Sequence, residues 1–519
     1  LTPLLLLGVS LPLLAQGAAK STPASKYPAA PAAAMASIKE ADLKRDLYAM
    51  AGDAMRGREA GTLDEMRASM WVAEQLRAIG VKPIGDDGTY FQWWNMRRTR
   101  VSTAASSVKS GGKALELWKD VVPTGNTEAD GAGAVVFVGD GSDSTVDVRG
   151  KVAVVTMSAP PRAVLQEGTN TYEYRYATSA IQSTTAKFRG RGAAAVVIIA
   201  DSTADIAFDG YAAIRSRGTY DVEGGVPRFA PTAAGAAGGG GRGAGGANGG
   251  GAMPSVVLLA RRSALTSFKN AGTIEAHIRM ERFDAPSVNI VGVIKGTDPK
   301  LKDEYVLYSS HQDHDGVRFE TQGDSIWNGA DDNASVSVAL LATARAFAKN
   351  PGKRSVLFVY HGAEERGLLG SRYHAAHPVV PLQQIVAVLN GDMIGRNNPD
   401  SASLLGIQPP HKNSSELVDM ALAANNLTGK FKLDSIWDRP THPEGWYFRS
   451  DHVPYARLNV PAIEYSTNLH PDYHTVRDEP SRIDYAKLTR MTQWMYLTGW
   501  YVANVAKRPG IDPGFKLER

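Results

Sequence analysis

The sequence predicts an α/β protein: a three-layer sandwich with a mixed, mainly parallel central sheet, into which a β-rich domain is inserted. Two observations support this class. After Pro286, runs with strand character alternate with segments of helical length, as in sheets built from parallel strands. Between about residues 130 and 282, short β-branched runs bounded by Gly, Asp or Pro read instead as closely spaced strands.

The composition is that of a globular protein with a large core. Hydrophobic residues make up 43% and charged residues 21% of the 519 residues, and this length allows two to four domains at roughly 150 residues each. The net charge of +4 gives no reason to propose nucleic acid or an anionic membrane as a partner. The chain has no cysteine, which excludes disulfides and leaves His, Asp and Glu as the ligands for any zinc.

Residues 1–19 are typical of a secretory signal peptide, because an apolar run is followed by small residues near Gly17 to Ala19. We therefore expect an exported protein, periplasmic or secreted, without stable membrane association after cleavage. Residues 20–36 are rich in Ala, Pro and Ser, and we expect a flexible tether there.

The remaining chain divides into three parts. We assign 37–125 and 286–519 to the larger domain and 126–285 to the inserted one. Within the insert, 235–251 is nearly all Gly and Ala and is predicted to be a disordered loop. Its glycines have dinucleotide-fingerprint spacing by composition alone, since no strand precedes them and no helical pattern follows.

The larger domain supplies its elements in a regular order. The segment 88–96 is aromatic and is expected to pack on a body elsewhere in the chain. Helical patterns cover 334–350 and 369–377. The expected strands are SVNIVGVIKG, YVLYSS, SVLFVYH, IVAVLNGD and PAIEYST. Ligands in such folds collect at the carboxyl ends of strands, so the polar residues that follow each run are candidate site residues.

The first polar cluster, His311 to His314, follows YVLYSS directly. In extended chain, residues two apart share a face, so His311 and Asp313 point the same way. This suits a metal-bound histidine with a carboxylate behind it that fixes its orientation. Taken alone, the cluster would also fit a polar loop after a strand.

Two further clusters contain adjacent carboxylates. Asp331 and Asp332 open a helical segment, where one carboxylate would suffice as a cap and a second is explained by bridging two cations. Glu364 and Glu365 follow SVLFVYH. Neighbouring carboxylates repel unless cations separate them, so one could bind metal while the other faces substrate. A solvated turn is the alternative for this pair.

The last clusters are Asn390 to Asp392, after IVAVL, and His470 to His474, after PAIEYST. An aspartate at the end of a buried strand is costly unless it is paired or metal-bound. Surface polarity is the alternative for the histidines. The order and strand-end placement of all the clusters together indicate a metal site.

These clusters, HQDH, NGADDNAS, GAEERGLLGS, LNGDMIGR and DYHT, resemble those of the co-catalytic dizinc exopeptidases, the family of bacterial leucyl aminopeptidases and glutamate carboxypeptidase. The resemblance covers roughly residues 287–505, with weaker agreement at 38–100. The inserted region resembles a protease-associated domain, which many members carry within the catalytic domain.

The resemblance implies a hydrolase that uses two zinc ions to remove residues from the amino end of peptides. It implies roles residue by residue: His311 and Asp392 on one zinc, Glu365 and His474 on the other, Asp332 bridging both, Glu364 as general base and Asp313 orienting His311. Tyr473 and His452 are assigned more weakly to substrate contact. In the implied reaction, a water activated by the two ions attacks the scissile carbonyl and Glu364 moves its proton.

Other residues were weighed and set aside. His361 is expected to end a buried strand, since no HExxH motif is present. His314, His374, His377 and His470 are interpreted as surface residues or as groups outside the metal ligands. Ser450, Asp451 and His452 cannot form a catalytic triad, because three consecutive residues do not converge.

Three alternative functions stay open. A carboxypeptidase or dipeptidase on the same scaffold would need a cation for a free carboxylate, with Arg396, Arg439 and Arg449 as candidates. A metal-free binding protein of this fold is disfavoured by the complete ligand set. A glutaminyl-cyclising enzyme on a related scaffold would work with one zinc rather than two.

Overall fold

The computed structural model describes residues 26–160, 172–223, 252–321 and 323–517. The expected signal peptide at 1–19 and the glycine-rich loop at 235–251 lie outside the described residues. Within the described ranges, no helix has the length and apolar character needed to cross a membrane.

The larger domain is built on a mixed sheet that runs through the described residues in the order β19-β18-β20-β17-β13-β16-β12-β2-β9, with β1 paired to β12. The bounds are β1 Lys82–Pro83, β2 Phe91–Val101, β9 Thr219–Val222, β12 Met280–Ile294, β13 Tyr305–His311, β16 Ser355–His361, β17 Ile385–Gly391, β18 Ser401–Leu405, β19 Lys432–Leu433 and β20 Ala462–Ser466. Strands β20, β17, β13 and β16 are mutually parallel. The pairings of β12 with β16, of β2 with β12 and β9, and of β18 with β20 are antiparallel. The expectation of a mainly parallel sheet therefore holds only for its centre.

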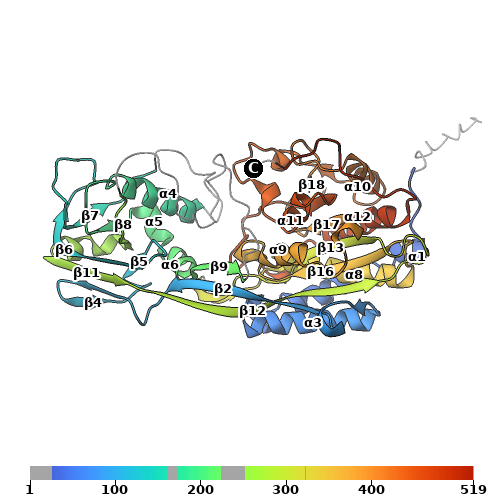
Figure 1. Ribbon diagram of the computed structural model, residues 1–519, viewed down its shortest axis with the longest axis horizontal. Helices are drawn as coiled ribbons and strands as arrows, with labels where there is room; N and C mark the ends of the chain where they lie inside the picture. The colour runs from blue at the N-terminus through green and yellow to red at the C-terminus, as the bar shows by residue number, and fades with distance from the viewer. Residues whose placement is uncertain (1–25, 161–171, 224–251, 322, 518–519) are drawn as a thin grey trace, which may run out of the picture.

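Helices cover both faces of this sheet and give three layers (Figure 1). On β13, Val306 and Tyr308 join one core cluster, while Tyr305 and Leu307 join another on the opposite face. Because the central strands are buried on both faces, they read as continuous apolar runs. One layer holds α1 Ala32–Met35, α2 Glu40–Met50, α3 Leu63–Ile79, α8 Val336–Lys349, α10 Ser415–Leu427 and α12 Tyr485–Asn504. The other holds α9 Leu369–Ala376 and α11 His452–Arg457.

A second sheet forms the inserted domain, in the order β4-β3-β11-β6-β7-β8-β10-β5. The bounds of its strands are β3 Ser107–Ser110, β4 Lys113–Leu115, β5 Val121–Pro123, β6 Ala129–Phe137, β7 Val152–Thr156, β8 Ala195–Ile199, β10 Val257–Ala260 and β11 Thr273–Ile278. Its helices are α4 Tyr172–Ala186, α5 Ser202–Ile206, α6 Phe208–Arg217 and α7 Leu265–Lys269. The sheet includes residues 107–123, which we had assigned to the larger domain. Strands β3 and β4 are short and largely exposed, and the buried strand β5 has only three residues, so this segment carries little of the apolar pattern on which that boundary depended.

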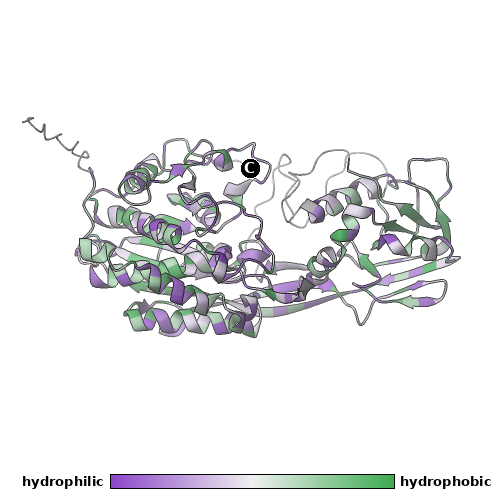
Figure 2. Ribbon diagram, turned by 180° about the vertical axis from the view of Figure 1, so that it is seen from behind, coloured by the Kyte–Doolittle hydropathy of each residue, from purple (hydrophilic) through white to green (hydrophobic). Residues whose placement is uncertain are grey.

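Two long strands connect the domains. Strands β2 and β12 pair from Phe91 to Val101 and continue from the central sheet toward the inserted domain (Figure 1). Between the two domains, the paired strands β2 and β12 are largely hydrophilic (Figure 2). In this stretch Arg97 pairs with Asp284 and Arg100 with Glu281. The aromatic segment expected to pack on another body is thus the start of β2.

The N-terminal segment departs from the expected flexible tether. From Lys26 onward it lies against α12: the Tyr27 ring stacks on Tyr501, with 4.9 Å between centroids, and the indole of Trp500 donates to the carbonyl of Ala29 at 3.1 Å. The helix α1 follows, with Ala34 in the core. Small residues that we interpreted as a tether pack closely here because they leave room for large aromatic partners.

Candidate metal centre

The polar clusters meet at the carboxyl ends of the four parallel strands. His311 is the last residue of β13, and Glu364 and Glu365 follow β16. Asp392 follows β17, and His474 lies in the loop after β20. Asp332 precedes α8 in a short helical turn, Ala330–Ser335. The chain order of the clusters therefore becomes one site in space.

One group of possible metal ligands comprises His311, Asp332 and Asp392. The Nε2 atom of His311 lies 3.2 Å from Oδ1 of Asp332 and 3.6 Å from Oδ1 of Asp392. The other ring nitrogen, Nδ1, contacts the backbone carbonyl of Asp313 at 3.1 Å. That contact leaves Nε2 free to act as a ligand.

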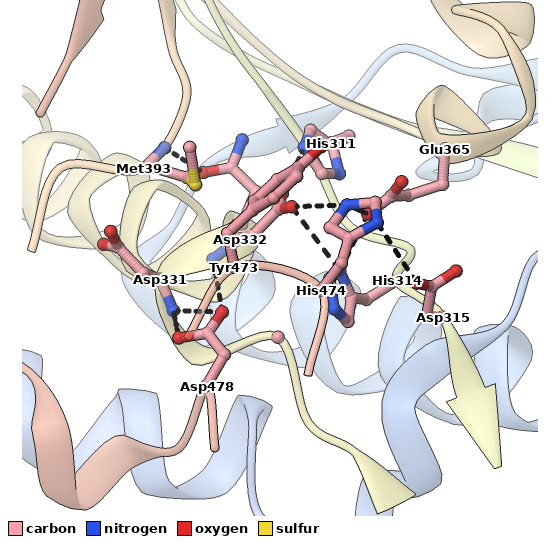
Figure 3. A network of polar contacts seen from close by, with 12 residues as sticks. His311, His314, Asp315, Asp331, Asp332, Glu365, Met393, Tyr473, His474 and Asp478 are labelled. Atoms are coloured by element: carbon pink, nitrogen blue, oxygen red, sulfur yellow. Dashed lines mark hydrogen bonds and ion pairs between the residues drawn. The ribbon is translucent and has the colours of Figure 1, made fainter. Parts of the chain in front are cut away.

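The second group comprises His314, Asp332, Glu365 and His474. The Nε2 atom of His474 lies 3.0 Å from Oδ2 of Asp332 and 3.1 Å from Oε1 of Glu365. Asp332 thus offers one carboxylate oxygen to each group (Figure 3). Its backbone N–H donates to the carboxylate of Asp478 at 3.0 Å, which fixes the turn that carries it.

The turn after β16 sends its two glutamates to different places. Glu365 joins the second group, whereas Oε2 of Glu364 lies 3.8 Å from Nε2 of His311. The carboxylate of Asp313 accepts the backbone N–H of Glu364 at 3.0 Å and of Glu365 at 3.3 Å. Its distance to Nδ1 of His311 is 3.9 Å. Asp313 therefore holds the glutamate turn more closely than it holds the histidine that we expected it to orient.

The site concentrates buried negative charge. Burial raises the pKa of Glu364 well above its usual range, and the carboxylates of Asp392 and Glu365 add to this. Burial lowers the pKa of His311, but Glu364 and Asp392 outweigh it and hold that pKa well above normal. Burial opposes the ionisation of Glu365 as well, yet His474 and His314 hold its pKa well below normal. A buried set of carboxylates and imidazoles is the donor set that zinc and similar divalent ions prefer.

A cluster of ion pairs stands behind His474. Its Nδ1 atom lies 3.3 Å from Oδ2 of Asp315. The other oxygen of Asp315 lies 2.8 Å from the Arg217 guanidinium and 3.3 Å from that of Arg366, and Arg318 also pairs with it. Arg217 ends α6, so the inserted domain reaches the group behind a candidate metal ligand. A carboxylate behind a ligating histidine fixes the ring and raises its basicity.

Arg58 joins the loops that carry the ligands. Its fully buried guanidinium donates to the carbonyls of Gln312 at 2.8 Å, Asn328 at 2.6 Å and Gly329 at 2.9 Å. The sequence predicts only packing or a turn at Gly57 and Arg58. The turn is present, because both residues have positive φ. The Arg58 side chain also joins the backbone segments on both sides of the site through its hydrogen bonds.

Tyr473 lies beside the ligands and connects to the inserted domain. Its hydroxyl accepts from Arg449 at 2.9 Å, and Glu444 pairs with Arg449 at 2.8 Å. Arg175 of α4 pairs with Glu444 through both guanidinium nitrogens, at 2.5 and 2.7 Å. A second chain of contacts from the inserted domain therefore ends at the edge of the centre.

Two interpretations of histidines need correction. His452 is fully buried in α11 with Nδ1 3.1 Å from Glu464, so it has no surface to offer a substrate. His314, interpreted as a surface or outlying group, is fully buried among the second group of ligands. His361 does end a buried strand, as expected. His374 and His470 are also buried rather than on the surface, while His377 is exposed.

Several residues around the site were not predicted, namely Asp315, Arg217, Arg318 and Arg366. The sequence held one usable signal: Asp315 extends the run His311 to Asp315 with the same two-residue spacing as His311 and Asp313. Arg318 follows Asp315 by three residues, whereas Arg217 and Arg366 come from distant segments and nothing local marks them.

The strand ends thus carry two adjoining groups of possible metal ligands, and known proteins resemble the chain in this region. Residues 289–498 match the model of peptidase family M28, which confirms the resemblance drawn from the motifs. The aminopeptidase YwaD of Bacillus subtilis (strain 168) is 26% identical over 243 residues, which are 45% of this chain and 49% of that protein. A probable zinc metalloprotease of Pyrenophora teres f. teres is 30% identical over 246 residues, 44% of this chain and 51% of that protein. The matched segment thus spans about half the length of these curated relatives.

Solved structures resemble the chain over a larger share. An aminopeptidase from Aneurinibacillus sp. strain AM-1 aligns with a TM-score of 0.52 at 18% identity, covering 92% of this chain and 97% of that one. BSAP, a zinc aminopeptidase from Bacillus subtilis, aligns with a TM-score of 0.54 at 17% identity, covering 92% and 98%. At these identities the likeness shows the fold, including a mixed α/β arrangement.

Proposed function

We propose that the protein is a zinc-dependent aminopeptidase that binds two zinc ions and removes residues from the amino end of peptides. The observation that carries the proposal is the carboxylate of Asp332, which offers one oxygen to each ligand group. Two ions held by one bridging carboxylate lie close enough to act on the same substrate atoms. The matched peptidase family and relatives with aminopeptidase in their names support the same reaction.

The residues present fit zinc. His311, Asp332 and Asp392 would hold one ion, and Asp332, Glu365 and His474 the other. All the donor atoms are imidazole nitrogens or carboxylate oxygens, as a chain without cysteine requires. When bound, the two ions would polarise the scissile carbonyl and lower the pKa of a water molecule between them.

Glu364 supplies the proton transfer. Its carboxylate lies 3.8 Å from Nε2 of His311 without belonging to either group, and burial raises its pKa. A carboxylate with a raised pKa accepts a proton from an attacking water and returns it to the leaving amine more readily than an ordinary one. Asp313 holds the backbone of Glu364 and so fixes the base against the reacting centre. The phenol of Tyr473, held by Arg449, lines the approach to the centre.

The charge around the centre favours the amino end of a peptide. A free α-amine is a cation, and the site is rich in carboxylates. A carboxypeptidase needs an arginine available for a carboxylate. Arg396 is already paired with Asp472 at 2.6 Å, and Arg449 with Glu444 at 2.8 Å. Two of the three candidate cations are thus neutralised by the protein itself.

A panel of aminoacyl and N-blocked peptides, assayed together with metal content, tests the proposal. We expect cleavage only of substrates with a free amino end and about two zinc ions per chain. Cleavage only of N-blocked peptides with a free carboxyl end would establish a carboxypeptidase instead. One zinc per chain would favour a cyclising enzyme, and no zinc would favour a binding protein.

The variant Glu364→Gln tests the role of the base. We expect it to keep both ions and to lose turnover by several orders of magnitude, since Gln cannot accept the proton. Glu416→Gln is the matched control, because Glu416 pairs with the exposed Lys507 far from the site. Near-normal turnover of Glu364→Gln would refute the assignment.

We further propose that the inserted domain is a protease-associated domain and that the protein is exported. The β-rich composition of the insert and its position between β2 and β12 support the first. The apolar run at the start of the chain followed by small residues supports the second. Activity recovered only from the cytoplasmic fraction of the producing cell would refute export.

A further inference from the structure

We propose that His314 is a metal ligand, so that the two ion positions are unequal: one is held by His314, Asp332, Glu365 and His474, and the other by His311, Asp332 and Asp392. The inference rests on the proposed pair of ions. It adds a ligand that the sequence motifs do not assign and a difference in affinity between the two positions.

The ring of His314 is buried without a hydrogen-bond partner among the described residues. His314 is fully buried, and neither ring nitrogen makes a hydrogen bond to the described residues. Buried polar groups without a partner cost about 1–3 kcal/mol each and are rare in folded proteins. A metal ion between the side chains would give Nδ1 its partner.

The closest contact of the His314 ring, to Glu365, does not have the geometry of a hydrogen bond. Nδ1 of His314 lies 2.8 Å from Oε1 of Glu365, which is a hydrogen-bond distance, yet neither atom is satisfied by a hydrogen bond. An ion bound by both atoms would account for a close approach that is not a hydrogen bond. Ligands of one ion have this relation.

The spacing of the four possible ligand atoms is close to that expected around one ion. All four lie within 4.8 Å of one another, with separations of 2.8, 3.0, 3.1 and 3.8 Å among the printed pairs. Ligands about 2.0–2.2 Å from a tetrahedral zinc are about 3.3–3.5 Å apart. The observed separations lie on both sides of this value, so a small adjustment would complete the site.

The surrounding backbone is shaped for this ring. Gly329 has a φ of 57°, and a side chain at Gly329 would overlap the His314 ring. The ring meets that of His474 edge-on (Figure 3), and the two ring centroids are 5.3 Å apart. A bridge between Glu59 and His314 and the bond from the His314 N–H to the Arg58 carbonyl fix its backbone. The position therefore allows little freedom for another use of the ring.

The two positions would therefore differ in how tightly they hold their ions. Four protein ligands are typical of zinc ions held for structure, whereas three leave a place for water or substrate. We expect the four-ligand position to fill first and to release its ion last. The competing interpretation is that His314 only supports Glu365, in which case the positions would fill without this order.

Metal titration of the metal-free full-length protein with Zn²⁺ against a competing chelator tests the proposal. The wild type should bind two ions with different affinities. His314→Ala should weaken the tighter one by at least about tenfold and leave the other within about threefold. His411→Ala is the matched control, because it removes another buried histidine, which pairs with Asp438 and lies outside both groups.

A second variant gives a spectroscopic readout. His314→Cys would place the only thiol of the chain at this position. The longer metal–sulfur bond, about 2.3 Å against about 2.0–2.1 Å for nitrogen, offsets the shorter side chain. With Co²⁺ bound, a thiolate charge-transfer band should appear in this variant and not in the wild type.

The outcomes separate the two proposals. A band in His314→Cys, or a selective loss of affinity in His314→Ala, supports the ligand assignment. Two zinc ions in the wild type, unchanged affinities in His314→Ala and no band in His314→Cys would overturn it and leave the proposed function standing. A wild type that binds no zinc would overturn the proposed function as well. If His314→Ala does not fold, the cobalt spectrum decides alone.

Discussion

Ion pairs lie behind the four-ligand group, whereas a neutral hydrogen-bonded cluster lies beside the strand end that carries His311 of the three-ligand group. Behind His474, Asp315 is surrounded by the guanidiniums of Arg217, Arg318 and Arg366. On the neighbouring strand β16, His361 lies opposite His311, and the buried rings of His361 and His374 share the hydroxyl of Tyr455, at 3.3 and 2.7 Å. Burial lowers the pKa of both rings, so both are neutral near pH 7.

The surroundings of the two ligand groups should therefore differ in how much stability a substitution costs. Removal of one member of a buried ion-pair cluster leaves the other charges unpaired and costs roughly 3–5 kcal/mol. A neutral hydrogen-bonded group has less to lose, about 0.5–1.5 kcal/mol for a typical bond. The ion-paired side also includes Arg217 of the inserted domain, so it depends on the position of that domain.

The largest expected effect breaks both sides at once. Asp332→Ala removes the one carboxylate common to the two groups, so both ions should be lost at micromolar zinc and turnover should fall by several orders of magnitude. Metal analysis after gel filtration measures this. Asp331→Asn, next in the chain and outside both groups, should retain two ions. Retention of two ions by Asp332→Ala would show that the carboxylate is not a bridge.

A pair of variants should separate the sides. Asp392→Ala removes a ligand from the three-ligand group only, and His474→Ala from the four-ligand group only. Each should retain about one ion per chain, and Asp392→Ala should retain the more tightly bound one. Chelator competition on both variants gives the two affinities. Loss of both ions in either variant would mean that the positions do not fill independently.

A smaller effect is expected behind the ligands. Asp315→Asn should weaken zinc at the four-ligand position by about 10- to 100-fold and leave the other position unchanged. It should also destabilise the protein by roughly 3–5 kcal/mol, because three guanidiniums lose their common partner. Asp400→Asn, which removes an exposed partner of Arg490, is the control for both measurements. Equal weakening of the two positions would remove the distinction between the sides.

The smallest effect concerns acid. Burial lowers the pKa of His374 to about 3 in the folded state. The unfolded chain binds this proton near pH 6.5, so the stability that the neutral ring contributes is present above pH 6.5 and is lost as pH falls toward 3. Between pH 7 and 5 the loss is about 2 kcal/mol, at about 1.4 kcal/mol per pH unit.

The variant His374→Leu should lack this part of the acid sensitivity. Thermal unfolding of metal-free protein at pH 7 and pH 5 measures it, with His377→Leu, an exposed neighbour, as the control. We expect the decrease in Tm on acidification to be smaller in His374→Leu than in the wild type or the control. An unchanged decrease would show that the ring is protonated in the folded protein.

The sequence predicted the parts of the site that depend on strand ends. His311, Glu364, Glu365 and Asp392 follow apolar runs that became parallel strands, and parallel strands bring their carboxyl ends together. The two-residue spacing after β13 groups His311 with Asp313 and does not mark His314, which we interpreted as a surface residue or a group outside the metal ligands. The backbone leaves the strand there and pairs with Glu59, which turns the ring inward. A partner more than 200 residues earlier gives no local signal.

The domain boundary failed for a related reason. Residues 107–123 form short strands whose partners in the second sheet come much later in the chain, such as β11 and β10. Strand β9 lies in the insert by sequence but pairs with β2 in the larger sheet. Apolar periodicity reports which segments are strands, but the choice of partner depends on contacts across the whole chain.

The paired strands β2 and β12 have a consequence for how such a molecule is divided. An insert attached through loops can be excised at the loops, but here the connection is an antiparallel ribbon whose two strands also belong to the central sheet. A cut through it would expose unpaired backbone in both pieces, which invites edge-to-edge association. The two domains are therefore connected through continuous paired strands rather than through a flexible loop. Shortening or lengthening both strands in matched two-residue steps would move the inserted domain without changing which side chains face outward.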